Sequence, residues 1–277
     1  MPYEFLKGHG TENDFVLLPD LDGTVHGELT AHQMAQRVRA LCDRRAGIGG
    51  DGVLRVVRST NPEAAWLMDY RNSDGSLSEM CGNGIRLFVR YLVDEGLADG
   101  SAPIAVDTRD GVKTLTVDGD LITADLGTPK VLGDTVVSVG DRTWPARHVD
   151  MGNPHAVAFV DSLDDAGRLF DPPTHDAAVY PAGVNVEFVV RRGERHVAMR
   201  VHERGSGETR SCGTGACAVM VAAAVADDNR PAASNRFSDV AYRVDVPGGT
   251  LTVTWTADDR VLLTGPAVIV ASGQTDL

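Results

Sequence analysis

The chain has 277 residues, of which 43% are hydrophobic, and its formal net charge is -13. This length and apolar content are sufficient for two modest globular domains. The acidic balance and the lack of a basic run argue against a partner that is nucleic acid or an anionic membrane. Because no apolar run approaches membrane-spanning length and the N-terminus lacks a secretion-signal pattern, we expect a cytoplasmic protein.

Three helices and many short strands are predicted along the chain. The first helix covers residues 31–45, with Thr30 as its N-cap, and the second covers the amphipathic segment 85–97. The third, 216–226, is apolar on every side and must therefore be enclosed. Runs of β-branched residues predict strands at 53–57, 65–71, 112–117, 121–126, 185–190, 196–202, 244–246, 251–255 and 261–264.

A short motif occurs twice, as Cys81-Gly82-Asn83-Gly84 and Cys212-Gly213-Thr214-Gly215, each time beside a predicted helix. The match extends upstream without a gap, which aligns Asn72 with Glu203. Residues 10–16 also resemble residues 151–157. We therefore predict a duplicated unit with divergent loops.

The repeated cysteines suggest acid–base chemistry. A cysteine at a helix N-terminus has its thiolate favoured by unpaired N–H groups and by the helix dipole, so we expect Cys81 and Cys212 to be reactive. Each half is expected to wrap strands around one central helix, with both helix N-termini facing a cleft between the halves. Such a pair suits inversion of a carbon next to a carboxylate, one thiolate removing the α-proton and the opposite thiol delivering another. The carboxylate would be held by N–H groups of Gly82, Asn83, Gly213 and Thr214.

Two cofactor-dependent alternatives are disfavoured by the residues. Pyridoxal chemistry needs a Schiff-base lysine, and none of the lysines lies in a cysteine-motif segment, although the residues alone do not exclude Lys7. The segment 47–52 satisfies G-x-G-x-x-G, but it follows a predicted helix and precedes a strand, which is the wrong context for a dinucleotide site. We expect no cofactor and no metal.

Six ordered motifs resemble the diaminopimelate epimerases, which are cofactor-independent enzymes of lysine and peptidoglycan biosynthesis. They lie at residues 10–15, 72–76, 80–84, 152–155, 183–185 and 203–215. The resemblance implies an isomerase that interconverts LL- and meso-2,6-diaminopimelate. It also implies an α/β chain of the α+β type with two pseudo-symmetric domains, 1–125 plus 265–277 and 126–264. Each would be a mixed sheet or barrel around a central helix, with the final strand, 267–271, packed on the first domain.

The resemblance also assigns roles to residues. Cys81 and Cys212 become the acid–base pair, and His155 and Glu203 assist catalysis. The polar groups of the substrate would be bound by Asn13, Asn72, Asn153, Asn185, Glu203 and Arg204. Arg204 suits the distal carboxylate because its planar fork can donate to both oxygens. Where some family members carry a substrate-binding glutamine, this chain has Gly52, which we leave outside the site.

Other functions remain open at this point. A proline or hydroxyproline racemase shares the two-thiol logic, but those enzymes typically carry histidine where this chain has Asn83, and they lack the context of Arg204. A cysteine hydrolase would pair Cys212 with His155, and a redox switch would join Cys81 to Cys212. Cys42 and Cys217 are expected to be buried structural residues. The sequence does not fix the oligomeric state, and a homodimer is compatible with it.

Overall fold

The computed structural model describes residues 2–231 and 238–277. The chain forms two compact units, which we call unit 1 (Met1–Ala124 with Gly265–Leu277) and unit 2 (Asp125–Thr264). Within the described residues, no helix is long and apolar enough to cross a membrane.

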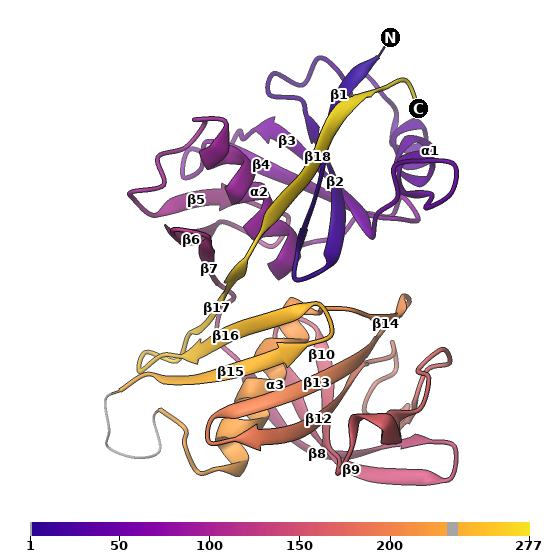
Figure 1. Cartoon of the computed structure of the whole chain (residues 1–277), viewed down its shortest axis with the longest axis vertical. Helices are drawn as coiled ribbons and strands as arrows, with labels where there is room; N and C mark the ends of the chain where they lie inside the picture. Colours follow the sequence, from indigo (N-terminus) through magenta and orange to yellow (C-terminus); the bar gives the residue numbers. More distant parts are fainter. Residues whose placement is uncertain (1, 232–237) are drawn as a thin grey trace. The chain divides into compact units, whose positions relative to one another are not determined.

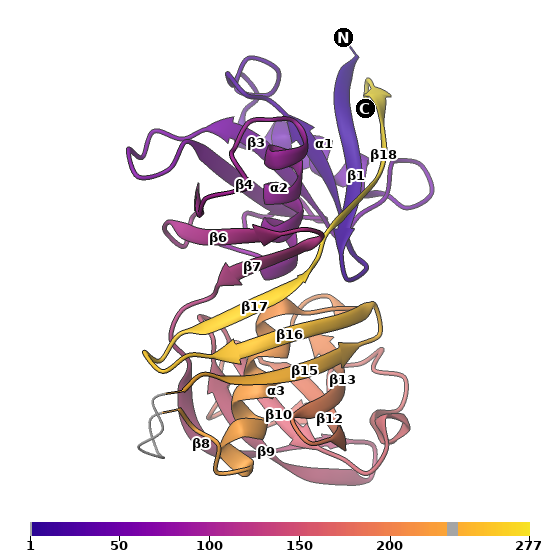
Figure 2. The same ribbon diagram turned by 60° about the vertical axis from the view of Figure 1, so that its left-hand side comes forward.

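Unit 1 is a mixed sheet with two helices (Figure 1). Its strands are β1 (Tyr3–Gly10), β2 (Asn13–Pro19), β3 (Gly52–Arg58), β4 (Trp66–Asn72), β5 (Ile104–Asp107), β6 (Lys113–Asp118), β7 (Leu121–Asp125) and β18 (Val268–Thr275), and its helices are α1 (Ala31–Cys42) and α2 (Gly82–Asp94). β2 runs parallel to β3 and β4 to β5, whereas β1–β2, β3–β4, β5–β6 and β6–β7 are antiparallel. β18 pairs antiparallel with β1, which confirms that the end of the chain returns to the first unit (Figures 1 and 2).

In unit 1, α1 and α2 pack against side chains on opposite faces of the same strands. Val16 and Val53 belong to a buried cluster with the α1 residues Met34, Val38 and Leu41. Their neighbours point the other way, because successive side chains of a strand alternate between its two faces. A Cβ atom at Gly84 of α2 would lie 3.2 Å from Leu54 Cδ2 and 3.4 Å from Phe15 Cζ. The first turn of α2 therefore rests on Phe15 and Leu54.

Unit 2 is a second mixed sheet around one central helix. Its elements are β8 (Lys130–Val139), β9 (Arg142–Asp150), β10 (Pro154–Phe159), η1 (Leu163–Ala166), β11 (Thr174–His175), β12 (Asn185–Gly193), β13 (His196–Glu203), β14 (Gly207–Thr209), α3 (Gly213–Ala226), β15 (Val240–Val246), β16 (Gly249–Trp255) and β17 (Val261–Pro266). β10 is parallel to β12, and β13 to β15. The remaining pairings of the unit, including β12–β13, β15–β16 and β16–β17, are antiparallel.

α3 is the core of unit 2. It contacts β9, β10, β12, β13, β15 and β16, and Figure 2 shows these strands around it. Ten consecutive residues from Gly215 to Ala224 are buried, which confirms the prediction of an enclosed helix. Cys217 has no exposed surface, and Cys42 at the end of α1 is also buried, as expected for structural cysteines.

Several predicted elements needed correction at their ends. The first helix stops at Cys42 instead of 45, because the Asp43 side chain accepts the N–H groups of Arg45 and Ala46 and forms a turn. The second and third helices begin earlier than predicted, at Gly82 and Gly213, since the cysteine before each is the N-cap. The second ends at Asp94, three residues early. β12 extends through the predicted turn to Gly193, and the sequence analysis predicts no strand at β1, β2, β5, β8–β11 and β14.

The enclosure of α3 predicts a steep positional dependence of stability. Ala223 is fully buried, so Ala223→Leu inserts methylene groups into a close-packed core and is expected to lower the free energy of unfolding by about 1–3 kcal/mol. Ala226 at the exposed end of the same helix is the matched control, and Ala226→Leu is expected to stay within about 0.5 kcal/mol of the parent. Urea unfolding followed by circular dichroism measures both. Equal effects at the two positions would contradict an enclosed helix.

Candidate active site

Each unit places one cysteine at the N-cap of its central helix. The Cys81 Sγ accepts the N–H of Gly84 at 3.4 Å, and the Cys212 Sγ accepts the N–H of Gly215 at the same distance. Both cysteines have extended backbone angles, and both carbonyl groups accept the first helical hydrogen bond. N–H groups in the first turn of an α-helix find no acceptor in that helix, so their acceptors come from outside it. The repeated motif thus builds the same local structure twice.

The Cys81 thiol lies beside a fixed amide. Asn13 Oδ1 is 3.6 Å from Cys81 Sγ and accepts from Asn83 Nδ2 at 3.2 Å. The other end of the amide, Asn13 Nδ2, donates to Asp51 at 2.7 Å. Asp51 in turn pairs with Arg44 at 2.7 Å, and burial raises the pKa of its carboxyl group. Asn13 is therefore held at both ends of its side chain, with its oxygen toward the thiol.

The remaining predicted residue of unit 1, Asn72, ends β4. Its Oδ1 accepts from the Tyr70 hydroxyl at 2.9 Å, and its Nδ2 donates to Ser76 Oγ at 3.0 Å. Both ends of this side chain are again fixed by protein groups. The structure therefore orients the amide, as a binding residue requires.

The Cys212 thiol lies in an acidic, buried environment. Burial, followed by the charges of Glu203 and Glu187, raises the pKa of Cys212 well above its ordinary value. Hydrogen bonds from the Gly215 N–H and the Thr214 hydroxyl lower the pKa but do not compensate. The expectation that the helix N-terminus favours a thiolate is therefore wrong for Cys212 in this structure, because desolvation and two carboxylates outweigh the helix end. The surroundings of Cys212 therefore favour the neutral thiol.

Three other predicted residues lie around the loop that joins β13 to α3. Glu203 accepts a hydrogen bond from the Thr209 hydroxyl. The buried Asn185 accepts the N–H of Arg204 at 2.9 Å and donates to the Pro154 carbonyl at 3.2 Å. The Arg204 side chain is exposed, and its Nη1 donates to the Ala182 carbonyl at 3.1 Å. Asn185 thus ties the start of this loop to the start of β10.

His155 and Asn153 form a chain with a residue that the sequence analysis did not single out. His155 Nδ1 is 2.6 Å from Glu187 Oε1, and His155 Nε2 is 3.0 Å from Asn153 Oδ1. Neither His155 nor Glu187 has exposed side-chain surface, whereas Asn153 is half-buried. The chain therefore runs from the core of unit 2 toward its surface.

Two residues next to the predicted site were missed from sequence. Glu187 is the single charged residue within the predicted apolar strand 185–190, and that break in the pattern was the available signal. Asp51 lies in the glycine-rich segment that had been considered only as a dinucleotide motif. The structure connects Glu187 to His155 and Asp51 to Asn13.

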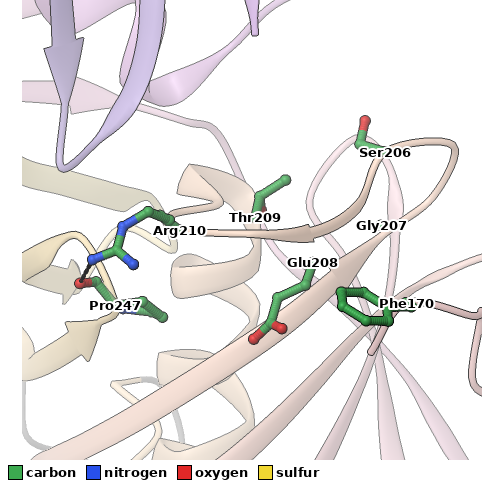
Figure 3. Close-up of a pocket in the computed structure, with 7 residues that line it drawn as sticks. All are labelled: Phe170, Ser206, Gly207, Glu208, Thr209, Arg210 and Pro247. Atoms are coloured by element: carbon green, nitrogen blue, oxygen red, sulfur yellow. Dashed lines mark hydrogen bonds between the residues drawn. The ribbon is translucent and has the colours of Figure 1, made fainter. Parts of the chain in front are cut away.

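A shallow pocket beside β14 does not include the predicted site residues. It is lined by Phe170, Ser206, Gly207, Glu208, Thr209, Arg210 and Pro247 (Figure 3). Arg210 donates to the Pro247 carbonyl at 2.9 Å, and Glu208 pairs with Arg200 at 2.6 Å. Because both charged groups are already engaged by the protein, we assign no binding role to this pocket.

The arrangement of two mixed-sheet units is a fold that solved structures share. A phenazine biosynthesis protein of the PhzF family from Bacillus anthracis matches with a TM-score of 0.73 at 16% identity, over all of both chains. A hydroxyproline epimerase from Agrobacterium vitis matches with a TM-score of 0.68 at 14% identity, over 99% of this chain and 92% of the other. These likenesses confirm the predicted fold class.

Sequence comparison then defines the family. The model of the family "Diaminopimelate epimerase" matches residues 5–132 and 147–270. The diaminopimelate epimerase of Streptomyces coelicolor is 58% identical over 285 residues, which cover 98% of this chain and 95% of that protein. That of Thermobifida fusca is 43% identical over 286 residues, covering 99% and 98%. The chain belongs to the diaminopimelate epimerase family and is an isomerase, which confirms the resemblance found in the sequence.

The structure explains why Gly52 carries no side chain. A Cβ atom there would lie 2.5 Å from the Arg71 carbonyl oxygen and 2.8 Å from Tyr70 Cε2, so the backbone would have to move. We expect Gly52→Gln to lower the free energy of unfolding by about 1–3 kcal/mol. Gly193, whose Cβ position has no atom within 4 Å, is the matched control, and Gly193→Gln should change stability by less than about 0.5 kcal/mol. Chemical denaturation of both variants checks this, and an unchanged midpoint for Gly52→Gln would contradict it.

Proposed function

We propose that this chain interconverts LL- and meso-2,6-diaminopimelate by removing and replacing the proton on Cα, without a cofactor. The observation that carries the proposal is the pair of N-cap thiols, one per unit, in a chain that belongs to the diaminopimelate epimerase family. Relatives from Streptomyces coelicolor and Thermobifida fusca bear that activity in their names. A two-base inversion needs two proton-transfer groups, and the duplication supplies two of the same kind.

The reaction requires the two thiols to reach opposite faces of one Cα atom. One sulfur takes the α-proton as a thiolate, and the other gives a proton as a thiol. The high pKa of Cys212 suits the proton-donating state, which leaves Cys81 as the thiolate in the same turnover. In the reverse direction the two exchange roles. Negative charge that develops on the substrate carboxylate would be stabilised by the first-turn N–H groups of Gly82, Asn83, Gly213 and Thr214.

The other predicted residues recognise and orient the substrate in this proposal. Asn13 and Asn72 are amides whose orientation the protein already fixes, so they lose little conformational entropy on binding. The exposed Arg204 guanidinium suits the distal carboxylate, because its fork donates two parallel hydrogen bonds. Asn153, Asn185 and Glu203 complete the polar set, and His155 and Glu203 assist proton transfer.

A cysteine hydrolase is supported less well by the geometry. Such an enzyme would use His155 to deprotonate Cys212. It would need only one thiol, so the second N-cap cysteine, Cys81, would have no role. Cys212 Sγ forms hydrogen bonds with Thr214 and Gly215.

Lys7, the lysine that the sequence left open for pyridoxal, pairs with Asp14 at 2.5 Å.

We infer the cellular location, the partners and the assembly of the enzyme from its charge, its family and its exposed residues. We place it in the cytoplasm, acting on a small-molecule substrate and without a nucleic-acid or membrane partner, in keeping with its net charge of -13. We propose a homodimer as its assembly. Val268 and Val270 of β18, which are 44% and 56% exposed, support an interface at that strand. Sedimentation equilibrium tests the assembly.

Removal of either thiol is expected to abolish epimerisation. Cys81→Ala and Cys212→Ala each leave one face of Cα without a proton-transfer group, so turnover of LL-diaminopimelate should fall by at least about a hundredfold. The assay is chiral chromatography together with NMR detection of deuterium at Cα in deuterated water. Cys42→Ala, which removes a buried thiol at the end of α1, is the control and should remain active. Near wild-type turnover in either test variant would eliminate the two-thiol mechanism.

Substrate identity is tested through Arg204. Lysine keeps the positive charge but cannot form the bidentate contact, so Arg204→Lys should lower kcat/KM for diaminopimelate at least about tenfold, or about 1.4 kcal/mol. Arg192, an exposed arginine on β12, is the control position, and Arg192→Lys should match the parent. Unchanged kcat/KM in Arg204→Lys would mean that the arginine does not recognise the distal carboxylate.

A further inference from the structure

The strand registers of the two units make their residues comparable one by one. In unit 1, parallel β2 and β3 place Phe15 opposite Gly52, and antiparallel β3 and β4 place Gly52 opposite Asn72. In unit 2, parallel β10 and β12 place His155 opposite Asn185. Two residues further along β3 and β12, the corresponding positions are Leu54 and Glu187. The positions equivalent to Phe15 and Leu54 are thus His155 and Glu187. This register corrects by one residue the predicted match of 10–16 with 151–157, which pairs Phe15 with Ala156.

Contacts at the helix N-termini support this equivalence independently. Gly84 and Gly215 are the third residues of α2 and α3. A Cβ atom on Gly84 would meet Leu54 Cδ2 at 3.2 Å, and one on Gly215 would meet Glu187 Oε1 at 2.8 Å. Leu54 and Glu187 therefore occupy the same place, directly below the turn that carries the thiol.

The same position is apolar in one unit and ionisable in the other. Phe15, Leu54, His155 and Glu187 are all fully buried. Unit 1 shows that a phenylalanine and a leucine fill this space in the same architecture. A buried histidine and carboxylate lose hydration, and replacement of such pairs by apolar residues of similar volume is often neutral or stabilising. The packing of the fold therefore does not account for the polar pair.

The geometry also constrains where the protons are. A carboxylate only accepts hydrogen bonds, so with Glu187 as a carboxylate the 2.6 Å contact to Oε1 is the one in which His155 Nδ1 carries the proton. The second nitrogen, Nε2, faces the side-chain amide of Asn153 at 3.0 Å. An amide can accept from a protonated Nε2 and, after rotation, donate to a bare one. The Asn153 side chain can therefore accompany either state of Nε2.

We propose that Glu187 is a positioning residue, which holds His155 with Nδ1 protonated so that Nε2 is the nitrogen that takes up and returns a proton during epimerisation. This inference rests on the proposed function, in which His155 assists proton transfer. When Cys212 must act as the base, Nε2 takes the proton of its thiol, which leaves a Cys212 thiolate and an imidazolium whose charge lies next to the Glu187 carboxylate. Return of the proton to the sulfur restores the thiol and the neutral ring. Unit 1, with Phe15 and Leu54, has no counterpart to this pair.

Other ionisable groups face the pair from neighbouring elements. The negative charge of Glu187 raises the pKa of Cys212, which caps α3, and the pKa of Tyr180. The pKa of His148 in β9 is lowered mainly by burial, and the charge of His155 lowers it further. A second observation concerns the carboxylate itself: within the described residues, Glu187 Oε2 is buried and has no hydrogen-bond partner. Glu187 Oε2 can therefore accept a hydrogen bond in addition to the contact between Oε1 and His155.

The first test is the tautomer of His155. Long-range ¹H–¹⁵N NMR of the wild-type protein should show His155 protonated on Nδ1 in its neutral form, with the signal assigned by its loss in His155→Phe. Glu187→Gln keeps an acceptor oxygen but removes the charge, and it should lower kcat at least about tenfold while KM changes less than about twofold. An Nε2-protonated ring in the wild type, or wild-type kcat in Glu187→Gln, would overturn the proposal.

A double-mutant cycle separates positioning from general damage. If Glu187 acts through His155, Glu187→Leu should cost nothing further in a His155→Phe background, whereas independent roles would give multiplied losses. The double variant rebuilds the Phe–Leu pair of unit 1, so it should fold with a Tm at or above that of the parent. Failure of this variant to fold would mean that the fold requires the polar pair, contrary to the argument.

The outcomes also separate this inference from the proposed function. If the wild-type protein placed no deuterium at Cα of diaminopimelate, the proposed function would fail. The NMR tautomer and the stability of the double variant would still decide whether Glu187 positions His155. If the wild type epimerised normally and Glu187→Gln did so equally well, the positioning role alone would fail.

Discussion

The first turn of one helix in each unit is the constraint on which the rest of the structure depends. A cysteine sulfur serves as the N-cap, so the thiol is fixed at the helix end by the N–H of the residue three positions later. That residue is glycine in both units, and a Cβ atom there would lie 3.2 Å from Leu54 Cδ2 in unit 1 and 2.8 Å from Glu187 Oε1 in unit 2. The absence of a side chain at this position of the CGxG motif lets the turn that carries the thiol pack closely on the strand below it.

Around this common feature the two units differ in their electrostatics. The sulfur in unit 1 lies beside the amide of Asn13, which is anchored to Asp51 and through it to Arg44. The sulfur in unit 2 is buried near two carboxylates, and its pKa is raised accordingly. The two halves of a duplicated scaffold thus place their thiols in unequal surroundings, and a two-base inversion needs two proton-transfer groups in different protonation states.

Preorganisation is a second common theme. The side chains of Asn13, Asn72 and Asn185 each have both ends bonded to protein groups. Their orientation is set before a substrate arrives, so binding need not order them. In unit 2 the same principle reaches into the core, where Glu187 orients His155.

The sequence by itself determined the duplication, the enclosed third helix and the two thiols, because each depends on local pattern: a repeated motif, an apolar segment without a polar face, and a cysteine before a glycine-rich turn. It also placed the end of the chain in the first unit, through the family resemblance. It did not determine the ends of the helices, since side-chain caps such as Asp43 act through a few local hydrogen bonds. Only the tertiary structure decided the state of Cys212 and the partners of His155 and Asn13. Those properties depend on burial and on contacts between residues that are distant in the sequence. Strand pairing brings Glu187 to the site and loop packing brings Asp51 there, and a local sequence pattern contains no information about either.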